Sequence, residues 1–314
     1  MRHQSLLGMN MWLLLPVSCA VSITFFAALG FHFAWMSVLP TLGIATVALA
    51  VHTFYTRVRP DDIIPVMAEA LAFLFLIIPP LAILEYPTQA LNFPLRDAEF
   101  AAMDKAIGFD WMGHVVWVSN HPLIGQCLSV AYHSCMVQLA AVVIVLSLLK
   151  RFDELREFLW LFVLCAIAVT AIAAVFPAEG AFAFHKPPAS LRIGNDAFAG
   201  LYHLADIRAL RDGSLHSISL DKVNGLVTLP SFHVIFAILL AWATRGIRFV
   251  FIPAVALNTV VSISAIAIGG HYAIDVITGA LMAFAAMYLY QKGPAIAAQL
   301  ANTWRSPQRS TATQ

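Results

Sequence analysis

Two short polar motifs interrupt long apolar stretches in the second half of the 314-residue sequence. One reads Gly-Gly-His-Tyr-Ala-Ile-Asp at positions 269–275, and the other reads Leu-Pro-Ser-Phe-His at positions 229–233. Ionisable side chains are costly in a segment that crosses a membrane, and they usually serve a function there. These two motifs are therefore the first candidates for chemistry.

The first motif contains a histidine and an aspartate that can work as a pair. His271 and Asp275 are four residues apart, so a helix would place them on one face. The carboxylate can accept the proton of one imidazole nitrogen, which leaves the other nitrogen free as nucleophile or base. Gly269 and Gly270 would let the backbone come close to a ligand. The spacing favours an activated histidine, although a structural hydrogen bond or half of a metal site would have the same spacing.

The second motif has the features of an anion-binding helix start. Pro230 suits the first turn of a helix, and Ser231 adds a hydroxyl beside free backbone N–H groups. His233 follows in the same turn, and a nearby loop carries Lys186 and Arg192. Two histidines, one carboxylate, a helix start and nearby cations are typical of phosphoryl transfer without a metal. We therefore expect no cofactor and no metal site.

The remaining polar residues carry weaker signals. Tyr132 belongs to a polar stretch that either lines a substrate cavity or joins helices by hydrogen bonds. The other histidines, His185 and His203 among them, have no comparable context, and we expect them to serve packing.

The elements that must position these residues are membrane helices. Hydrophobic residues make up 61% of the chain and charged residues only 11%, against about 25% charged in soluble proteins. The net charge of +1 gives no reason to expect a nucleic-acid partner. Eight apolar stretches have roughly the length of a membrane span: 11–29, 33–51, 63–84, 123–149, 158–177, 230–244, 249–268 and 272–290. The sequence therefore predicts an all-α, polytopic integral membrane protein with about eight transmembrane helices.

The placement of the basic residues predicts the orientation. With the N-terminus inside, short loops and tails on that side receive Arg2, Arg57, Arg59, Lys150, Arg151, Arg156, Arg245, Arg248, Lys292, Arg305 and Arg309. The other lysines and arginines are spread over two long segments, 85–122 and 178–229. Short basic loops belong on the cytoplasmic side of a cell membrane, so we expect cytoplasmic termini. Both motifs then lie at the outer or periplasmic face. Segment 85–122 contains Trp111 and Trp117, and we expect an interfacial helix there that caps the outer cavity and helps choose the substrate.

The two motifs together resemble those of the type-2 phosphatidic acid phosphatase superfamily. The resemblance covers Pro-Ser-Phe-His at 230–233 and Gly-His-Tyr-x-x-Asp at 270–275. It implies a six-helix membrane core. We therefore expect two added transmembrane helices in residues 1–60, a catalytic membrane core in 61–292 and a cytoplasmic tail in 293–314.

The sequence departs from the usual superfamily motifs at several positions. Phe232 stands where most members have glycine, and Ala265 replaces an arginine. The first motif, Lys-x6-Arg-Pro, has its best candidate in Lys186 with Arg192, which is one residue short and lacks the proline. A lookalike at 52–60 is rejected because it falls on the cytoplasmic side. The altered pattern is similar to the inositol phosphorylceramide synthase and sphingomyelin synthase branch, or inositolphosphotransferase-like members, which transfer a phospho-headgroup.

The resemblance implies a role for each candidate residue. His271 would attack phosphorus to form a phospho-histidine, Asp275 would orient it, and His233 would protonate the leaving oxygen and then activate the acceptor. Three groups would hold the phosphoryl oxygens: Ser231, Lys186 and Arg192.

Several functions remain open at this stage. The leading one is a membrane phosphotransferase or phosphatase acting on a phospholipid or an isoprenoid phosphate, with an alcohol such as inositol as a possible acceptor. Hydrolysis of a lipid phosphate or polyprenyl pyrophosphate is the alternative. A transporter with a His/Asp relay predicts further acidic residues in mid-span, and a metal-binding protein predicts retained zinc.

Overall fold

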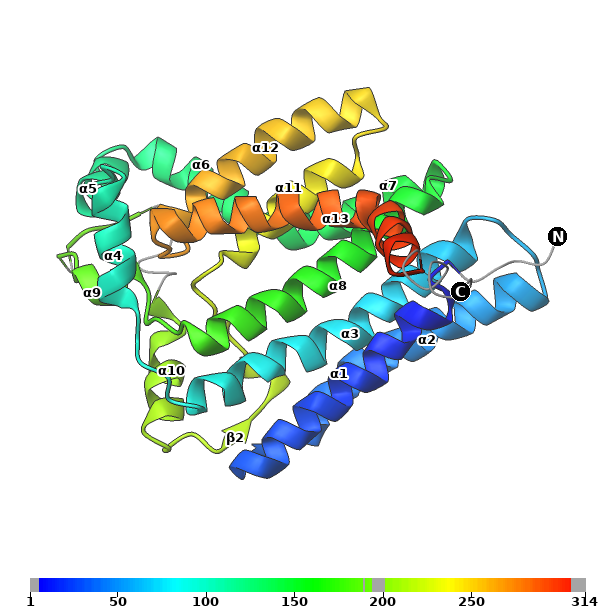
Figure 1. Cartoon of the computed structure of the whole chain (residues 1–314), viewed down its shortest axis with the longest axis horizontal. Coiled ribbons are helices and arrows are strands. Elements are labelled where there is room, and N and C mark those ends of the chain that lie inside the picture. The colour runs from blue at the N-terminus through cyan, green and yellow to red at the C-terminus, as the bar shows by residue number, and fades with distance from the viewer. Residues whose placement is uncertain (1–5, 189, 194–200, 306–314) are drawn as a thin grey trace, which may run out of the picture.

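The computed structural model describes residues 6–188, 190–193 and 201–305, with side chains described as far as residue 293. Arg2, Arg309 and the last nine residues of the predicted tail, 306–314, lie outside these ranges. Within them the chain is nearly all helix (Figure 1). Its strands are β1 (His32–Phe33) and β2 (Ser217–Ile218), which pair in parallel. This confirms the predicted all-α membrane fold.

In the described part of the chain, six long apolar helices are able to cross a membrane. They are α1 (Gly8–Leu29), Trp35–Arg57 (the 3-10 helix η1, Trp35–Val38, with α2, Leu39–Arg57), α3 (Ile64–Ala90), α8 (Phe152–Val175), α12 (Arg248–Ala267) and the segment Ala273–Gly293 of α13 (Ala273–Arg305). Two more predicted spans differ from expectation. The 123–149 stretch forms α6 (Pro122–His133) and α7 (Cys135–Leu148), bent by 49° at Ser134. The 230–244 stretch forms α11 (Phe232–Ala243).

The helix α11 is too short to cross the bilayer by itself. Its 12 residues span about 18 Å at 1.5 Å per residue, against a hydrocarbon core of about 30 Å. It packs instead against α7, α8, α12 and α13 in the middle of the bundle. Side chains such as Ile235, Phe236 and Leu239 belong to the largest core cluster. Apolar residues around the whole of α11 therefore reflect burial within protein.

Local signals fix the ends of the spans. Helix α1 ends at Gly30, whose φ of 71° lies in the left-handed region that favours glycine. Helix α3 begins beside Asp61, whose carboxylate accepts hydrogen bonds from the N–H groups of Ile63 (2.7 Å) and Ile64 (2.8 Å). Pro122 opens α6, where its missing N–H has no intrahelical partner to lose.

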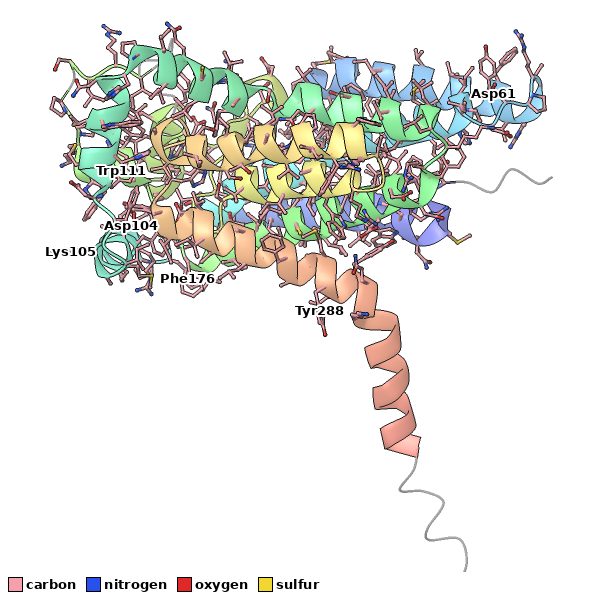
Figure 2. The ribbon with its side chains drawn as sticks, turned by 90° about the horizontal axis from the view of Figure 1, so that it is seen from above. Asp61, Asp104, Lys105, Trp111, Phe176 and Tyr288 are labelled. Atoms are coloured by element: carbon pink, nitrogen blue, oxygen red, sulfur yellow. The ribbon has the colours of Figure 1, made fainter. Side chains whose placement is uncertain are left out.

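Short helices gather at one end of the bundle. They are α4 (Asp97–Ala106), α5 (Trp111–Ser119), α9 (Ala181–His185), α10 (Leu204–Arg211) and the 3-10 helix η3 (Leu220–Lys222). Figure 1 shows α4, α5 and α9 beside the start of α13 and the end of α12. Figure 2 shows Asp104, Lys105 and Trp111 at this end and Asp61 at the opposite end. The single interfacial helix expected in 85–122 is thus two helices, α4 and α5.

Buried carboxylates join helices near the opposite end. Glu69 in α3 accepts hydrogen bonds from the Leu6 N–H (2.8 Å) and from the Trp12 indole (3.1 Å). Glu157 in α8 accepts the Trp242 indole N–H at 3.0 Å and forms an ion pair with Arg245. A buried carboxylate needs such partners, because leaving it unpaired is strongly unfavourable.

The helix α13 comes very close to the residues before α11. A methyl group added at Gly279 would lie 2.7 Å from the Ser231 carbonyl oxygen and 3.3 Å from the Val234 Cβ. Glycine therefore permits the close crossing that brings the two polar motifs together.

Replacing Gly279 by alanine is expected to lower the melting temperature in detergent, because overpacking costs about 1–3 kcal/mol. The matched control is Gly43→Ala in α2, where the added methyl group meets no atom within 4 Å. That control should melt at the wild-type temperature or slightly above, because alanine favours a helix over glycine. Equal melting temperatures for the two variants would contradict the close crossing.

Candidate active site

His271 and Asp275 meet at the junction between α12 and α13. The Nδ1 atom of His271 lies 3.2 Å from Oδ2 of Asp275, and the same oxygen accepts the Tyr272 N–H at 2.9 Å. Both side chains are buried, with 5% and 0% of their residue surface exposed. The predicted pair is present, but α13 begins at Ala273, so the contact spans a turn before the helix and not a helix face. A proton on Nδ1 leaves Nε2 free.

The second motif is hydrogen-bonded directly to the first. Ser231 is the residue that precedes α11, and its N–H donates to the Asp275 carbonyl oxygen at 3.0 Å. The Ser231 hydroxyl is buried and has no hydrogen-bond partner in the described part of the chain, and the same holds for Oδ1 of Asp275. A buried hydroxyl without a protein partner is available to a ligand.

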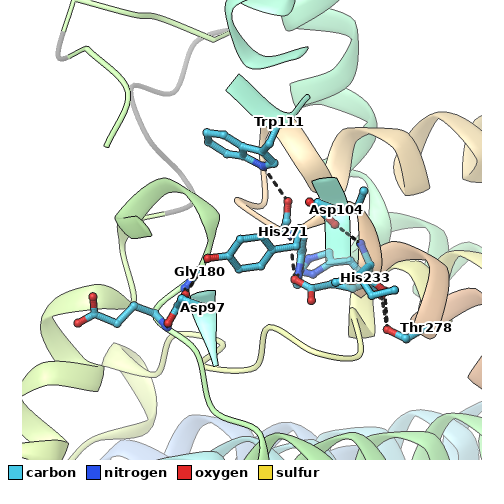
Figure 3. A network of polar contacts seen from close by, with 12 residues as sticks. Asp97, Asp104, Trp111, Gly180, His233, His271 and Thr278 are labelled. Atoms are coloured by element: carbon cyan, nitrogen blue, oxygen red, sulfur yellow. Dashed lines mark hydrogen bonds and ion pairs between the residues drawn. The ribbon is translucent and has the colours of Figure 1, made fainter. Parts of the chain in front are cut away.

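His233 lies in the first turn of α11, within electrostatic range of His271. Its ring stacks on Tyr132 of α6, with centroids 4.2 Å apart and planes at 17°. The Tyr132 hydroxyl lies 3.3 Å from Nδ1 of His233. This contact joins α6 to α11, and Gln138 of α7 accepts a hydrogen bond from Asn258 of α12 at 2.8 Å, so the structure shows the polar stretch joining helices by hydrogen bonds. A role for Tyr132 in lining a substrate cavity stays a prediction. Figure 3 shows His233 and His271 in one network of polar contacts.

Two aspartates of α4 hold the turn that carries His271. Asp104 accepts hydrogen bonds from the N–H groups of Ala273 (2.9 Å) and Ile274 (2.8 Å) and so caps α13. Asp97 accepts the Tyr272 hydroxyl at 2.9 Å (Figure 3). Burial raises the pKa of Asp104, and burial together with the neighbouring Asp97 carboxylate raises the pKa of the Tyr272 phenol. Sequence reasoning missed both aspartates, although their seven-residue spacing places them on one helix face.

Asp97 also fixes the chain after α8. Its two oxygens accept the N–H groups of Glu179 and Gly180, both at 2.9 Å. The next N–H, of Ala181, donates to the Gly270 carbonyl at 2.9 Å. Gly180 has a φ of 99°, in the region where only glycine is unstrained. The segment that begins the long 178–229 connection is thereby tied to the histidine turn.

Two histidines expected to serve packing lie close to this turn. Trp111 donates its indole N–H to the His271 carbonyl at 3.0 Å and stacks on His185 at 4.9 Å between centroids. His203 donates from Nε2 to the Glu179 carbonyl at 2.9 Å. Burial lowers the pKa of both His185 and His203. The sequence offered no local signal for either, since their contacts come from distant segments.

The two predicted phosphate-binding cations lie at the surface. Lys186 ends α9, and Arg192 follows in the same connection, with its backbone N–H donating to the Ser119 hydroxyl at 3.3 Å. Both residues are exposed, and neither side chain makes a hydrogen bond or ion pair within the described ranges. Their part in phosphate binding therefore stays a prediction. The Arg208 guanidinium donates two hydrogen bonds to the Glu179 carboxylate, at 2.7 and 3.0 Å, and these bonds lower the pKa of Glu179.

The position of the missing arginine is next to His271. Ala265 is fully buried, and its carbonyl oxygen accepts the His271 N–H at 3.2 Å. An arginine there would start directly beside the histidine. The resemblance implies an arginine at this position, and alanine brings no positive charge there.

Replacing Asp104 by alanine is expected to loosen the start of α13, because a lost helix cap costs about 0.5–2 kcal/mol. Hydrogen–deuterium exchange of peptides covering 268–276 should then become faster. The control is Asp110→Ala, since Asp110 caps α5 through the Gly113 N–H at 2.9 Å. It should speed exchange near 111–115 alone. Unchanged exchange at 268–276 in Asp104→Ala would show that Asp104 does not hold this turn.

Comparison with known proteins identifies a family. The family model described as the PAP2 superfamily matches residues 98–289, more than half of the chain. The matched region contains both polar motifs, α5 to α12 in full, and most of α4 and of the α13 span. No curated protein and no solved structure matches the chain. The chain is an integral membrane protein that belongs to the PAP2 superfamily.

Proposed function

We propose that the protein is a membrane enzyme that cleaves a lipid phosphate ester through a phospho-histidine at His271. Membership of the superfamily supports phosphatase or phosphotransferase chemistry on lipid phosphates in general. The observation that carries the specific proposal is the buried His271–Asp275 pair facing the start of α11, where Ser231 has a free hydroxyl. These groups match the needs of an activated nucleophile and an anion site.

The proposed reaction has two steps. In the first, the Nε2 lone pair of His271 attacks phosphorus, the bond from phosphorus to the leaving oxygen breaks, and His233 gives that oxygen a proton. In the second, His233 takes a proton from water or an alcohol, whose oxygen attacks phosphorus and breaks the N–P bond. Asp275 stays ionised and stabilises the imidazolium. The stacked Tyr132 ring holds the imidazole of His233 in place.

The phosphoryl oxygens need several donors. We assign the Ser231 hydroxyl and the free N–H groups in the first turn of α11 to this role. Lys186 and Arg192 are the proposed cations, and both would have to turn inward from the surface positions described above. The loss of an arginine at Ala265 makes their contribution more important. No metal is needed in this scheme, because the cations and the helix start provide the positive field.

Transfer to an alcohol such as inositol is the form of the reaction we favour over hydrolysis. The support is the likeness of the altered motifs to the inositol phosphorylceramide synthase branch. The bulky Phe232 ring packs against Phe162 of α8 and Phe236 of α11, with ring centroids 5.6 Å and 6.1 Å apart. Its effect on the reaction would therefore be indirect, through the packing of α11 on α8. Hydrolysis of a lipid phosphate or polyprenyl pyrophosphate remains the alternative.

A transporter with a proton relay finds less support. It requires carboxylates inside the spans that are free to exchange protons. Glu69 and Glu157 are engaged by the tryptophan and backbone or arginine donors described above. Glu85 accepts the Leu226 N–H at 2.8 Å. These contacts favour structural roles for all three glutamates.

We also propose that the site faces the outer or periplasmic side, with cytoplasmic termini. Most of the basic residues that occur in short loops lie in three connections, α2–α3, α7–α8 and α11–α12, or at their helix ends. These connections lie at the end of the bundle opposite α4, α5 and α9 (Figure 1). Short basic loops favour the cytoplasmic side.

The first test uses purified protein and a phospholipid with a radioactive headgroup phosphate, with and without inositol. Wild-type protein should release labelled phosphate or form a labelled inositol product, and His271→Ala should do neither. His233→Ala should be slower by about 10²–10⁴, the usual value of acid–base catalysis. The exposed His216 lies outside the site, so His216→Ala should keep wild-type activity. Activity in His271→Ala would contradict the nucleophile assignment, and the labelled product decides between transferase and hydrolase.

Removal of metals provides a second test. The described residues contain no group of three histidine, cysteine, aspartate or glutamate side chains able to hold a metal ion. Treatment with EDTA followed by gel filtration is therefore expected to leave the rate unchanged. Elemental analysis of the same sample is the control. Loss of activity that zinc restores would contradict the metal-free mechanism and favour a metal site at the histidines.

A further inference from the structure

A deep groove runs between α1 and α2 on the surface of α3. Its volume is about 630 Å³, and its walls come from all three helices. Both α1 and α2 pack on α3, which forms the floor of the groove. The groove lies outside the region that matches the superfamily, since that match begins at residue 98. None of the residues that line it belongs to the site at His271.

The lining of the groove is almost entirely apolar. Phe26, Phe75, Leu76 and Ile83 are among its residues. Ser22 also lines it, but its hydroxyl is already bonded to the Pro80 carbonyl at 2.9 Å. A ligand in the groove therefore gains little from hydrogen bonds and much from burying apolar surface. This chemistry fits a hydrocarbon chain.

The position and length of the groove identify the source of that chain. On α1 the lining runs from Leu15 to Ala27, a distance of about 18 Å at 1.5 Å per residue. One leaflet of the hydrocarbon core is about 15 Å deep, half of the 30 Å total. The groove is thus about as long as one leaflet is thick, and it lies between three helices able to span the membrane.

One end of the groove has interfacial character. His32, Phe33 and Trp35 line it there, and Trp35 is 66% exposed. Tryptophan and histidine, with an apolar body and a polar edge, suit the level of the lipid head groups. A chain that enters from this end would leave its head group beside His32 and Trp35.

We propose that the groove between α1, α2 and α3 binds one hydrocarbon chain of a bilayer lipid, with the head group at the His32–Trp35 end. The bound chain packs the two N-terminal helices together. The same end carries β1, which is joined to β2 through the His32 N–H to the His216 carbonyl (2.7 Å) and the Ala34 N–H to the Ile218 carbonyl (2.9 Å). The lipid therefore also supports the 178–229 connection, which leads to Ser231.

The experiment uses a phosphatidylcholine with a diazirine on its acyl chain, in nanodiscs containing the full-length protein. Illumination should label peptides of α1, α2 and α3 that line the groove, at a level above the lipid-exposed face of α12. Ala27→Trp should remove that label, because Ala27 lines the groove. The matched control is Ala28→Trp, one residue along the helix, also exposed and not part of the lining. It should be labelled like wild type.

A second variant keeps the test valid if Ala27→Trp does not fold. Thr41→Trp fills the groove from the α2 wall and should also remove the label. The proposal is overturned if either folded variant is labelled like wild type, or if groove peptides are labelled no more than α12. Native mass spectrometry that shows a dimer dissociated by Ala27→Trp would also overturn it, because a second copy would then occupy the groove. The labelling does not depend on enzyme activity, so it is independent of the proposed reaction.

Discussion

Asp275 is the residue on which the arrangement of the site depends. Its carboxylate holds the His271 imidazole and the Tyr272 N–H, while its carbonyl accepts the N–H of Ser231. One residue thus connects two motifs that lie about forty positions apart in the sequence. Because the carboxylate is fully buried, its hydrogen bonds are strong and its geometry is fixed. The absence of a side chain at Gly279 is what allows the two segments to approach so closely.

The second support for the site comes from α4, and this part could not be predicted from the sequence. The pairing of His271 with Asp275 follows from their spacing, which local geometry alone makes favourable. Asp97 and Asp104 act on backbone N–H groups of α8–α9 and α13, and nothing in a single sequence says which distant N–H group a carboxylate will meet. Their role depends on how α4 folds back over the end of the bundle. Lys186 shows the converse, because the resemblance implies a contact with the phosphoryl oxygens while its side chain lies at the surface.

The fold was more predictable than the site, because hydropathy and length govern membrane helices. The long apolar stretches became helices, and the charges marked their ends. Hydropathy cannot distinguish a helix buried in protein from a helix buried in lipid, since both environments favour the same apolar residues. The helix α11 is apolar because protein surrounds it, although it is too short to be a span. The bend at Ser134 falls within the polar stretch around Tyr132, but a few polar residues in an apolar segment do not by themselves predict a bend.

The pairing of β1 with β2 has a consequence for how the chain assembles during synthesis. His32 lies opposite Ser217 in the ladder, so most of the chain must be made before these strands can meet. The contacts of α1 and α2 with α3 join neighbours in sequence and form early, whereas such a distant pairing forms late. The N-terminal hairpin therefore waits in the membrane with its strand unpaired until the 178–229 connection arrives. Closure of this small sheet is one of the contacts, with those of Asp97 and Asp104, that tie the first third of the protein to the last.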